Sequence, residues 1–152
     1  MSDIKYFYDG PKFTDVFITP VQYKQEYFQI EIEMESELFF ELRKRNNILP
    51  YKLSDSGKKE LETIKRYFSE HTKTFYFLFD KEEIIGSILW VKNYISSLSV
   101  LKKYQRKGYG EQLIKYAVNT IFDNGYKTAE LDILEGNIPA EKLYEKIGFR
   151  KN

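Results

Sequence analysis

The stretch of this chain best suited to chemistry joins a short strand to a helix through two closely spaced glycines. The strand is expected over Tyr94–Val100, and a basic segment, Lys102–Gly110, follows it. Backbone N–H groups in the first turn of a helix lack partners, and the helix dipole makes that end positive. Gly108 and Gly110 would let a phosphate approach this backbone closely. We interpret the stretch as a pyrophosphate-binding turn; the alternative is a basic turn without a ligand.

Two other phosphate-binding motifs are absent. The sequence contains no G-x-x-x-x-G-K-[ST], which excludes a nucleoside-triphosphate P-loop. Leu113 stands where the dinucleotide fingerprint requires a third glycine. Beyond the glycines, apolar residues recur as adjacent pairs every four positions, which predicts an amphipathic helix that ends at Asn124-Gly125.

Composition limits the classes of function. The 152 residues predict a single domain, and 24 basic against 23 acidic residues give a formal charge of +1, which disfavours nucleic-acid binding. Cysteine is absent and His71 is the single histidine, so we expect no metal site. No apolar run approaches the roughly 20 residues of a membrane span. The N-terminus lacks the apolar stretch of a signal peptide. We expect no membrane association and a cytoplasmic protein.

The first half predicts a strand over residues 4–9 and, after a turn, a second strand over 13–19, so that residues 1–19 would form a strand or hairpin. Thr19-Pro20 is typical of a helix start, and we expect a long helix to Arg45, although residues 28–34 also alternate as in a strand. Ser54 or Asp55 would begin the next helix.

That second helix would run to Glu70 with its apolar residues, Tyr67 among them, facing inward. We interpret His71 as a C-terminal cap rather than a catalytic histidine. In the second half we expect strands over 74–79, 84–91, 94–100 and 126–134, a helix over 140–147 started by Pro139, and a last strand from Gly148.

Two motifs in this order resemble the GNAT N-acetyltransferase superfamily. Gln105–Gly110 matches the family pattern Q/R-x-x-G-x-G/A, and Asn137–Phe149 matches N-x-x-A-x-x-L-Y-x-x-x-G-F at each fixed position. The motifs cover residues 94–149, whereas the first half matches only by its order of elements. The resemblance implies a single α/β domain over residues 1–152, with a mixed sheet and the order β-α-α-β-β-β-α-β-α-β.

The resemblance also implies acetyl-coenzyme A as acetyl donor, held by residues 94–149. Backbone groups around Leu98 and Val100 would pair with the pantetheine arm, and Asn137 would lie near the thioester. Tyr144 would protonate the departing thiolate as general acid. At unshifted values this proton transfer is uphill by roughly 2 kcal/mol, which a hydrogen bond to the developing anion in a dry site can offset. The pyrophosphate would bind the amides of Gln105, Arg106, Lys107, Gly108, Tyr109 and Gly110.

The general base is unassigned. Removing the proton of an alkylammonium group at neutral pH costs about 4 kcal/mol, and many family members place a carboxylate for this step on the strand that here reads Tyr94–Val100, which has none. Glu130, Asp132 and Glu135 are candidates, with solvated surface charges as the alternative. The acidic run Glu31–Glu37 would attract a cationic amine or form a solvated helix face.

The chain stops at Asn152, whereas the family usually continues through a further strand. We expect the N-terminal strand Ile4–Asp9, or a partner subunit in a homodimer, to cover the sheet edge left exposed. The function expected is transfer of an acetyl group to a primary amine of a small molecule or peptide. The alternative is an inactive coenzyme A-binding module. Aromatic residues of the first half would line an acceptor pocket or fill the core: Tyr23, Tyr27, Phe28, Phe39, Phe40 and Tyr51.

Overall fold

Alternating side chains along β3 (Phe75–Asp80) give the sheet two apolar faces. In the computed structural model, which describes residues 3–152, Phe75 and Phe77 enter one core, whereas Tyr76 and Leu78 enter the other. This alternation follows from the two-residue period of a strand. The sheet is therefore a layer between helices.

The sheet is mixed, and its order differs from the order along the chain. Neighbouring strands are antiparallel except β5 and β6, which are parallel. The strands in spatial order are β2 (Val21–Gln22), β3, β4 (Glu83–Val91), β5 (Tyr94–Val100), β6 (Ala129–Leu134), β1 (Asp3–Tyr8) and β7 (Arg150–Lys151).

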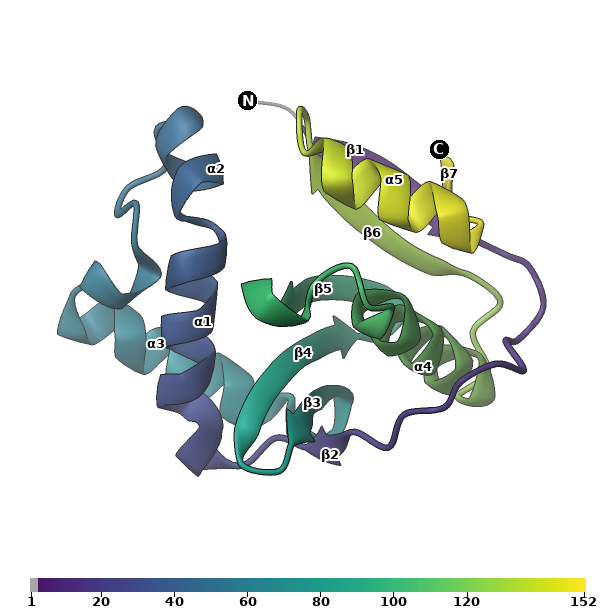
Figure 1. Ribbon diagram of the computed structural model, residues 1–152, viewed down its shortest axis with the longest axis horizontal. Helices are drawn as coiled ribbons and strands as arrows, with labels where there is room; N and C mark the ends of the chain where they lie inside the picture. Colours follow the sequence, from purple (N-terminus) through teal and green to yellow (C-terminus); the bar gives the residue numbers. More distant parts are fainter. Residues whose placement is uncertain (1–2) are drawn as a thin grey trace.

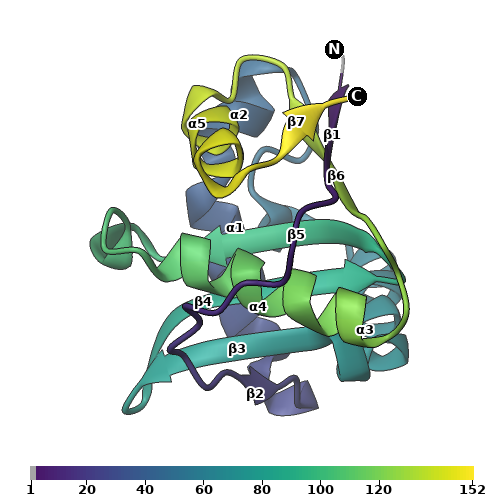
Figure 2. The same cartoon turned by 90° about the vertical axis from the view of Figure 1, so that its right-hand side faces the viewer.

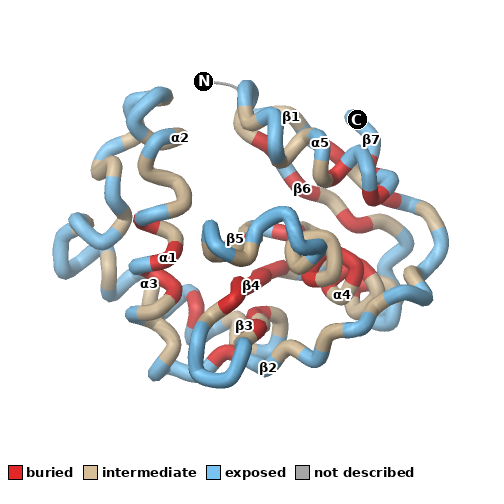
Figure 3. Tube along the Cα trace, in the orientation of Figure 1, coloured by how far each residue is buried: buried red, intermediate tan, exposed pale blue. Residues whose placement is uncertain are grey.

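The helices cover both faces of the sheet (Figures 1 and 2). Helix α4 (Tyr109–Asp123) lies across one face, and α1 (Phe28–Leu38) and α3 (Lys58–Glu70) lie behind the other in Figure 2. Helix α2 (Phe40–Arg45) continues from α1, and α5 (Ile138–Ile147) lies beside β6 and β1 in Figure 1. Buried residues run along β4 and α4, as the red segments of Figure 3 show.

The predicted α/β fold class is confirmed, and the second half agrees closely with expectation. Strand β5 has the predicted bounds, and β3, β4 and α5 differ by one or two residues at an end. Strand β6 begins at Ala129 rather than at residue 126. The last strand is present but short.

The long helix expected from Thr19 to Arg45 is wrong at its start. Val21 pairs with Phe77 in the edge strand β2, and the Tyr23 ring stacks on Phe75 with centroids 5.0 Å apart. These sheet contacts override the Thr-Pro pattern, and α1 begins only at Phe28. The helix is also interrupted at Phe39, so α2 is a separate element.

The next helix begins at Lys58 after a Gly57 N-cap, later than the predicted Ser54 or Asp55. Tyr67, predicted to face inward, is 38% exposed. His71 is the C-cap of α3, and its Nδ1 lies 2.8 Å from the Tyr67 carbonyl oxygen, in agreement with the predicted capping role.

Strand β1 lies beside β6 in the sheet, although the two strands are far apart in the sequence. Its residues Asp3–Tyr8 pair with Leu134–Ala129 of β6, and β7 pairs with its other edge. The β6 edge is thus covered by this chain's own N-terminal strand rather than by a partner subunit. Of the strand or hairpin expected for residues 1–19, the strand is present over Asp3–Tyr8. The hairpin is not formed, because residues 13–19 form no strand and instead run along α4.

Candidate active site

The sheet forks between its parallel strands. Tyr94 of β5 pairs with Glu130 of β6, and no further registered pair joins these strands within residues 3–152. The register of β4 and β5 also shifts, because Trp90 pairs with Ile95 and Leu89 with Ser97, so that Ser96 is an extra residue. Such bulges bend a strand and redirect its side chains. Beyond Tyr94 the two strands diverge toward α1 and α2 (Figure 1).

A cavity of about 380 Å³ lies at this fork. One wall is β5 and the opposite wall is β6, while the α1–α2 region and α5 close the sides. Because β5 has lost its β6 neighbour here, its edge is free to pair with an extended ligand. The cavity lining includes Glu35, Phe39, Leu98, Asp132, Asn137 and Tyr144.

The glycine-rich turn presents unpaired amides beside this cavity. Arg106 (φ 63°) and Gly108 (φ 89°) have left-handed backbone conformations, and Gly108 is the N-cap of α4. Within the described chain, the amide N–H groups of residues 106–110 donate to no protein acceptor. The Gln105 amide, also predicted to bind the pyrophosphate, instead donates to the Lys102 carbonyl oxygen at 3.2 Å. Successive free N–H groups at a helix start suit an anion such as a pyrophosphate. The residues present therefore fit this part of coenzyme A.

The turn is fixed to the strand that precedes it and is contiguous with the cavity. Gln105 Nε2 donates to the Val100 carbonyl oxygen at 2.9 Å. A methyl group added at Gly110 would lie 3.5 Å from Leu143 Cδ2 and 3.8 Å from Leu98 Cδ2, and both leucines line the cavity. One of the basic side chains near the turn, Lys103, forms an ion pair with Glu83 at 2.7 Å and so is already paired.

Tyr144 and Asn137 reach the cavity from α5. Tyr144 is 8% exposed, and burial raises the pKa of its phenol, which keeps the hydroxyl protonated at neutral pH. Asn137 is the N-cap of α5, where its Oδ1 accepts a hydrogen bond from the Ala140 amide at 3.4 Å. The geometry therefore brings Tyr144, Asn137 and Leu98 to one cavity, whereas residues 105–110 adjoin it at the start of α4.

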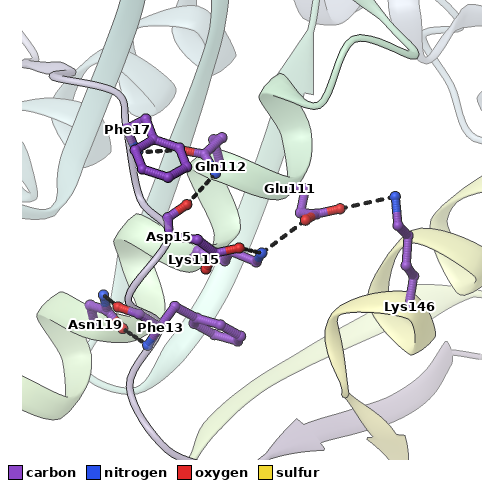
Figure 4. A network of polar contacts seen from close by, with 8 residues as sticks. All are labelled: Phe13, Asp15, Phe17, Glu111, Gln112, Lys115, Asn119 and Lys146. Atoms are coloured by element: carbon purple, nitrogen blue, oxygen red, sulfur yellow. Dashed lines mark hydrogen bonds and ion pairs between the residues drawn. The ribbon is translucent and has the colours of Figure 1, made fainter.

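Helix α4 is held by the segment that follows β1 (Figure 4). Asn119 exchanges hydrogen bonds with the Phe13 backbone at 2.8 Å each, and Gln112 Oε1 accepts from the Phe17 amide. Lys115 is buried and contacts Asp15 at 2.6 Å and Glu111 at 2.8 Å. These contacts fix the helix that begins at the glycine-rich turn.

The predicted bases have different surroundings. Glu130 lies 3.7 Å from Lys5 and is partly exposed, and Asp132 accepts a hydrogen bond from the Tyr94 hydroxyl at 2.9 Å at the cavity wall. A second carboxylate, Glu35, lines the cavity; the sequence placed it in the acidic run and not among the candidate bases. The interpretation of the acidic run as a solvated helix face is wrong for Glu31, which is 0% exposed.

The aromatic residues of the first half have mostly structural positions. Phe39 lines the cavity, whereas Tyr23, Tyr27 and Phe28 belong to the core on the α1–α3 face. Among residues 3–152, no three His, Asp or Glu side chains come close enough to share a metal ion. No helix in the same range is long and apolar enough to span a membrane.

The mixed sheet, its fork and the glycine-rich turn define an α/β fold of the N-acetyltransferase type. The family described as "Acetyltransferase (GNAT) family" matches residues 24–149, and the chain belongs to this family. The chain is 32% identical over 81 residues to the uncharacterized N-acetyltransferase YobR of Bacillus subtilis, covering 51% of this chain and 33% of that protein.

Two further proteins illustrate the similarity. N-alpha-acetyltransferase 30 of Xenopus laevis is 33% identical over 94 residues, which covers 55% of this chain and 34% of that protein. This chain therefore spans about a third of the length of the curated relatives it matches. The PaiA N-acetyltransferase of Thermoplasma acidophilum, solved with coenzyme A, has a TM-score of 0.63 at 18% identity, covering 88% of this chain and 90% of its own.

Proposed function

We propose that residues 1–152 form one N-acetyltransferase domain that transfers the acetyl group of acetyl-coenzyme A to a primary amine. The observation that carries this proposal is the cavity at the β5–β6 fork, which Tyr144 and the free edge of β5 share. Acetyl-coenzyme A supplies an activated thioester. The coenzyme A complex of PaiA supports this donor, and the name of N-alpha-acetyltransferase 30 supports a peptide N-terminus as one class of acceptor.

In this proposal the chain's residues divide the work of binding and proton transfer. The free amides of residues 106–110 bind the pyrophosphate, the β5 edge at Leu98–Val100 pairs with the pantetheine arm, and Asn137 lies near the reacting end. The Tyr144 hydroxyl donates its proton to the departing sulfur. Its raised pKa keeps the phenol protonated at neutral pH but makes full proton transfer to the thiolate more costly. The hydrogen bond to a developing thiolate in a dry cavity would offset that cost.

Binding and transfer are tested separately. Acetyl-coenzyme A at 100 times its dissociation constant should add about 2.7 kcal/mol of stability, which raises the melting temperature by roughly 5–10 °C for a chain of this size. Dephospho-coenzyme A and ATP serve as controls. Thiol release with an amine panel then measures transfer. A selective thermal shift without thiol release would favour the inactive coenzyme A-binding module, and no shift would contradict both functions.

A further inference from the structure

Two carboxylic acids lie on one face of α1, and one of them lines the cavity. Glu31 and Glu35 are one helical turn apart, which puts their side chains on the same face of α1. Glu31 is fully buried, and Glu35 lines the cavity that Tyr144 reaches from the opposite element. Glu33, between them in sequence, is exposed. The two glutamates thus form an inward-facing pair.

The surroundings of Glu31 favour its protonated, neutral form. The Ser87 hydroxyl of β4 donates to Glu31 Oε1, while Glu31 Oε2 is buried with no protein donor among residues 3–152. An unpaired buried carboxylate is strongly unfavourable. A proton on Glu31 directed to the neighbouring Glu35 would satisfy both groups. Burial, followed by the charge of Glu35, raises the pKa of Glu31 well above its ordinary value, in agreement with a neutral acid.

Glu35 is the member of the pair that can exchange protons with a ligand. Burial raises its pKa, while the hydrogen bond from Glu31 and the charge of Arg43 act in the opposite direction. Arg43 also lines the cavity, and its Nε donates to the Pro50 carbonyl oxygen at 2.8 Å. Other ionisable groups nearby are Tyr23, which faces Glu31, Tyr144 at the same cavity, and the Tyr94–Asp132 pair on the far strands. A carboxylate with a raised pKa is a better proton acceptor at neutral pH.

We propose that Glu35 binds the acceptor's ammonium group and removes its proton, that neutral Glu31 positions Glu35, and that the acceptor is a primary amine on an apolar group. This inference rests on the proposed acetyltransferase function. The apolar part of the acceptor would contact the hydrophobic wall between α1 and η2 (Leu53–Asp55), formed by Phe39, Leu42, Ile48 and Leu53.

The proton transfers balance. Glu35 accepts one proton from the ammonium ion, and the neutral nitrogen forms the C–N bond as the C–S bond breaks. The Tyr144 hydroxyl gives its proton to the departing sulfur, and the second nitrogen proton restores that hydroxyl as the amide forms. Glu35 then releases its proton to water, which leaves amide, free thiol and one proton.

Asp132 is the competing base at the same cavity. It lies on the exposed side of β6, and its carboxylate already accepts the Tyr94 hydroxyl. Burial and this carboxylate raise the pKa of Tyr94 to about 12, so the tyrosine remains a donor to Asp132 at neutral pH. Asp132 is therefore the better-solvated of the two carboxylates, and Asp132→Asn is the variant to compare with Glu35→Gln.

The first test compares matched variants with hexylamine and leucinamide as acceptors. Glu35→Gln should lower kcat/KM by at least about 100-fold with the acetyl-coenzyme A dissociation constant unchanged, whereas Glu33→Gln, on the exposed face, should match the wild type. If Asp132→Asn lowered kcat/KM by this amount and Glu35→Gln did not lower it, the assignment would be overturned. Faster transfer to hexylamine than to ethanolamine supports the apolar acceptor; the reverse order overturns it. Leucinamide distinguishes an amino-acid-like acceptor from a simple alkylamine.

The second test reads the positioning role from pH dependence. The wild-type kcat/KM should fall at low pH as Glu35 becomes protonated. Glu31→Met removes the donor that favours ionised Glu35, so this acid limb should move to higher pH. Glu31→Gln retains a neutral donor and should bring the midpoint back toward the wild-type value. An acid limb that neither variant moves would overturn the role of Glu31.

A third readout does not require activity. Protein labelled with ¹³C at glutamate carboxyl carbons reports the titration of Glu35 directly, with Glu35→Gln identifying its resonance. The resonance should titrate above the range of the exposed glutamates and shift when hexylamine is added; an ordinary titration without a hexylamine response would overturn the inference. Because this measurement needs no acetyl-coenzyme A, failure of the proposed function is seen separately, as a missing thermal shift.

Discussion

Tyr94 and Glu130 form the registered pair at which β5 and β6 meet, and beyond it the two strands separate around the candidate active site. The separation follows from the next residues of each strand. Ser96 is an extra residue in β5, and β6 pairs on its other side with β1. The fork therefore leaves backbone groups unpaired on the facing edges of β5 and β6, while β1 covers the other edge of β6.

Tyr144→Phe tests the general acid. The hydroxyl is removed while the ring keeps its contact with Phe149, whose centroid is 5.6 Å away. Loss of general acid catalysis should lower turnover by about 100-fold or more and leave acetyl-coenzyme A affinity nearly unchanged, because no hydrogen bond of this hydroxyl is needed for cofactor binding in our proposal. Steady-state kinetics and calorimetric binding measure the two effects. Tyr116→Phe on α4 is the control, and unchanged turnover in Tyr144→Phe would remove this residue from the acid role.

Gly108→Ala tests the glycine-rich turn. Gly108 has a φ of 89°, which an L-residue adopts at a cost of roughly 1–2 kcal/mol. The melting temperature of the variant should therefore fall by roughly 2–8 °C. Its methyl group would extend into space that no protein atom occupies within 4 Å, where we expect the pyrophosphate, and acetyl-coenzyme A affinity should fall as well. Gly110→Ala is the comparison, since its methyl would make ordinary contacts. Equal stability of the two variants would contradict the prediction.

Tyr6→Ala tests the position of β1. The Tyr6 side chain is 0% exposed in the core formed with β6 and α5. Its truncation should lower the free energy of unfolding by about 3–5 kcal/mol, measured by urea denaturation. Phe17 is 83% exposed, so Phe17→Ala should be nearly neutral. A mild effect of Tyr6→Ala would mean that β1 is not part of the folded core.

Glu111→Gln tests the ion-pair network that holds α4 (Figure 4). The hydrogen bond from Lys115, followed by that from Lys146, keeps the pKa of Glu111 below its ordinary value. Such a group stabilises the fold above its unfolded-state pKa and loses that contribution as pH falls through its folded-state pKa. The variant should therefore melt below the wild type at pH 7, and the difference should vanish in strong acid. Exposed Glu62→Gln is the control; a difference that persists in acid would indicate lost packing instead.

Local sequence patterns determined much of the second half. Strand β5, the glycine turn, α4 and the Asn137-Pro139 start of α5 depend on residues close together in the chain: glycines that accept special backbone conformations, capping side chains and an apolar helical period. The same residues carry the family motifs. These elements could be predicted because neighbouring residues suffice to specify them.

Only the tertiary structure decided the remaining features of the site. The pairing of Asp3 with Leu134, the bulge at Ser96 and the cavity between β5 and β6 depend on contacts across the whole chain. The acidic helix α1 shows the reason. Glu31 and Glu33 are the same residue type two positions apart. Ser87, 56 residues beyond Glu31, donates a hydrogen bond to Glu31 inside the protein, whereas Glu33 is exposed to water. Burial is set by packing partners distant in sequence, and burial makes the Glu31–Glu35 pair a candidate for proton transfer.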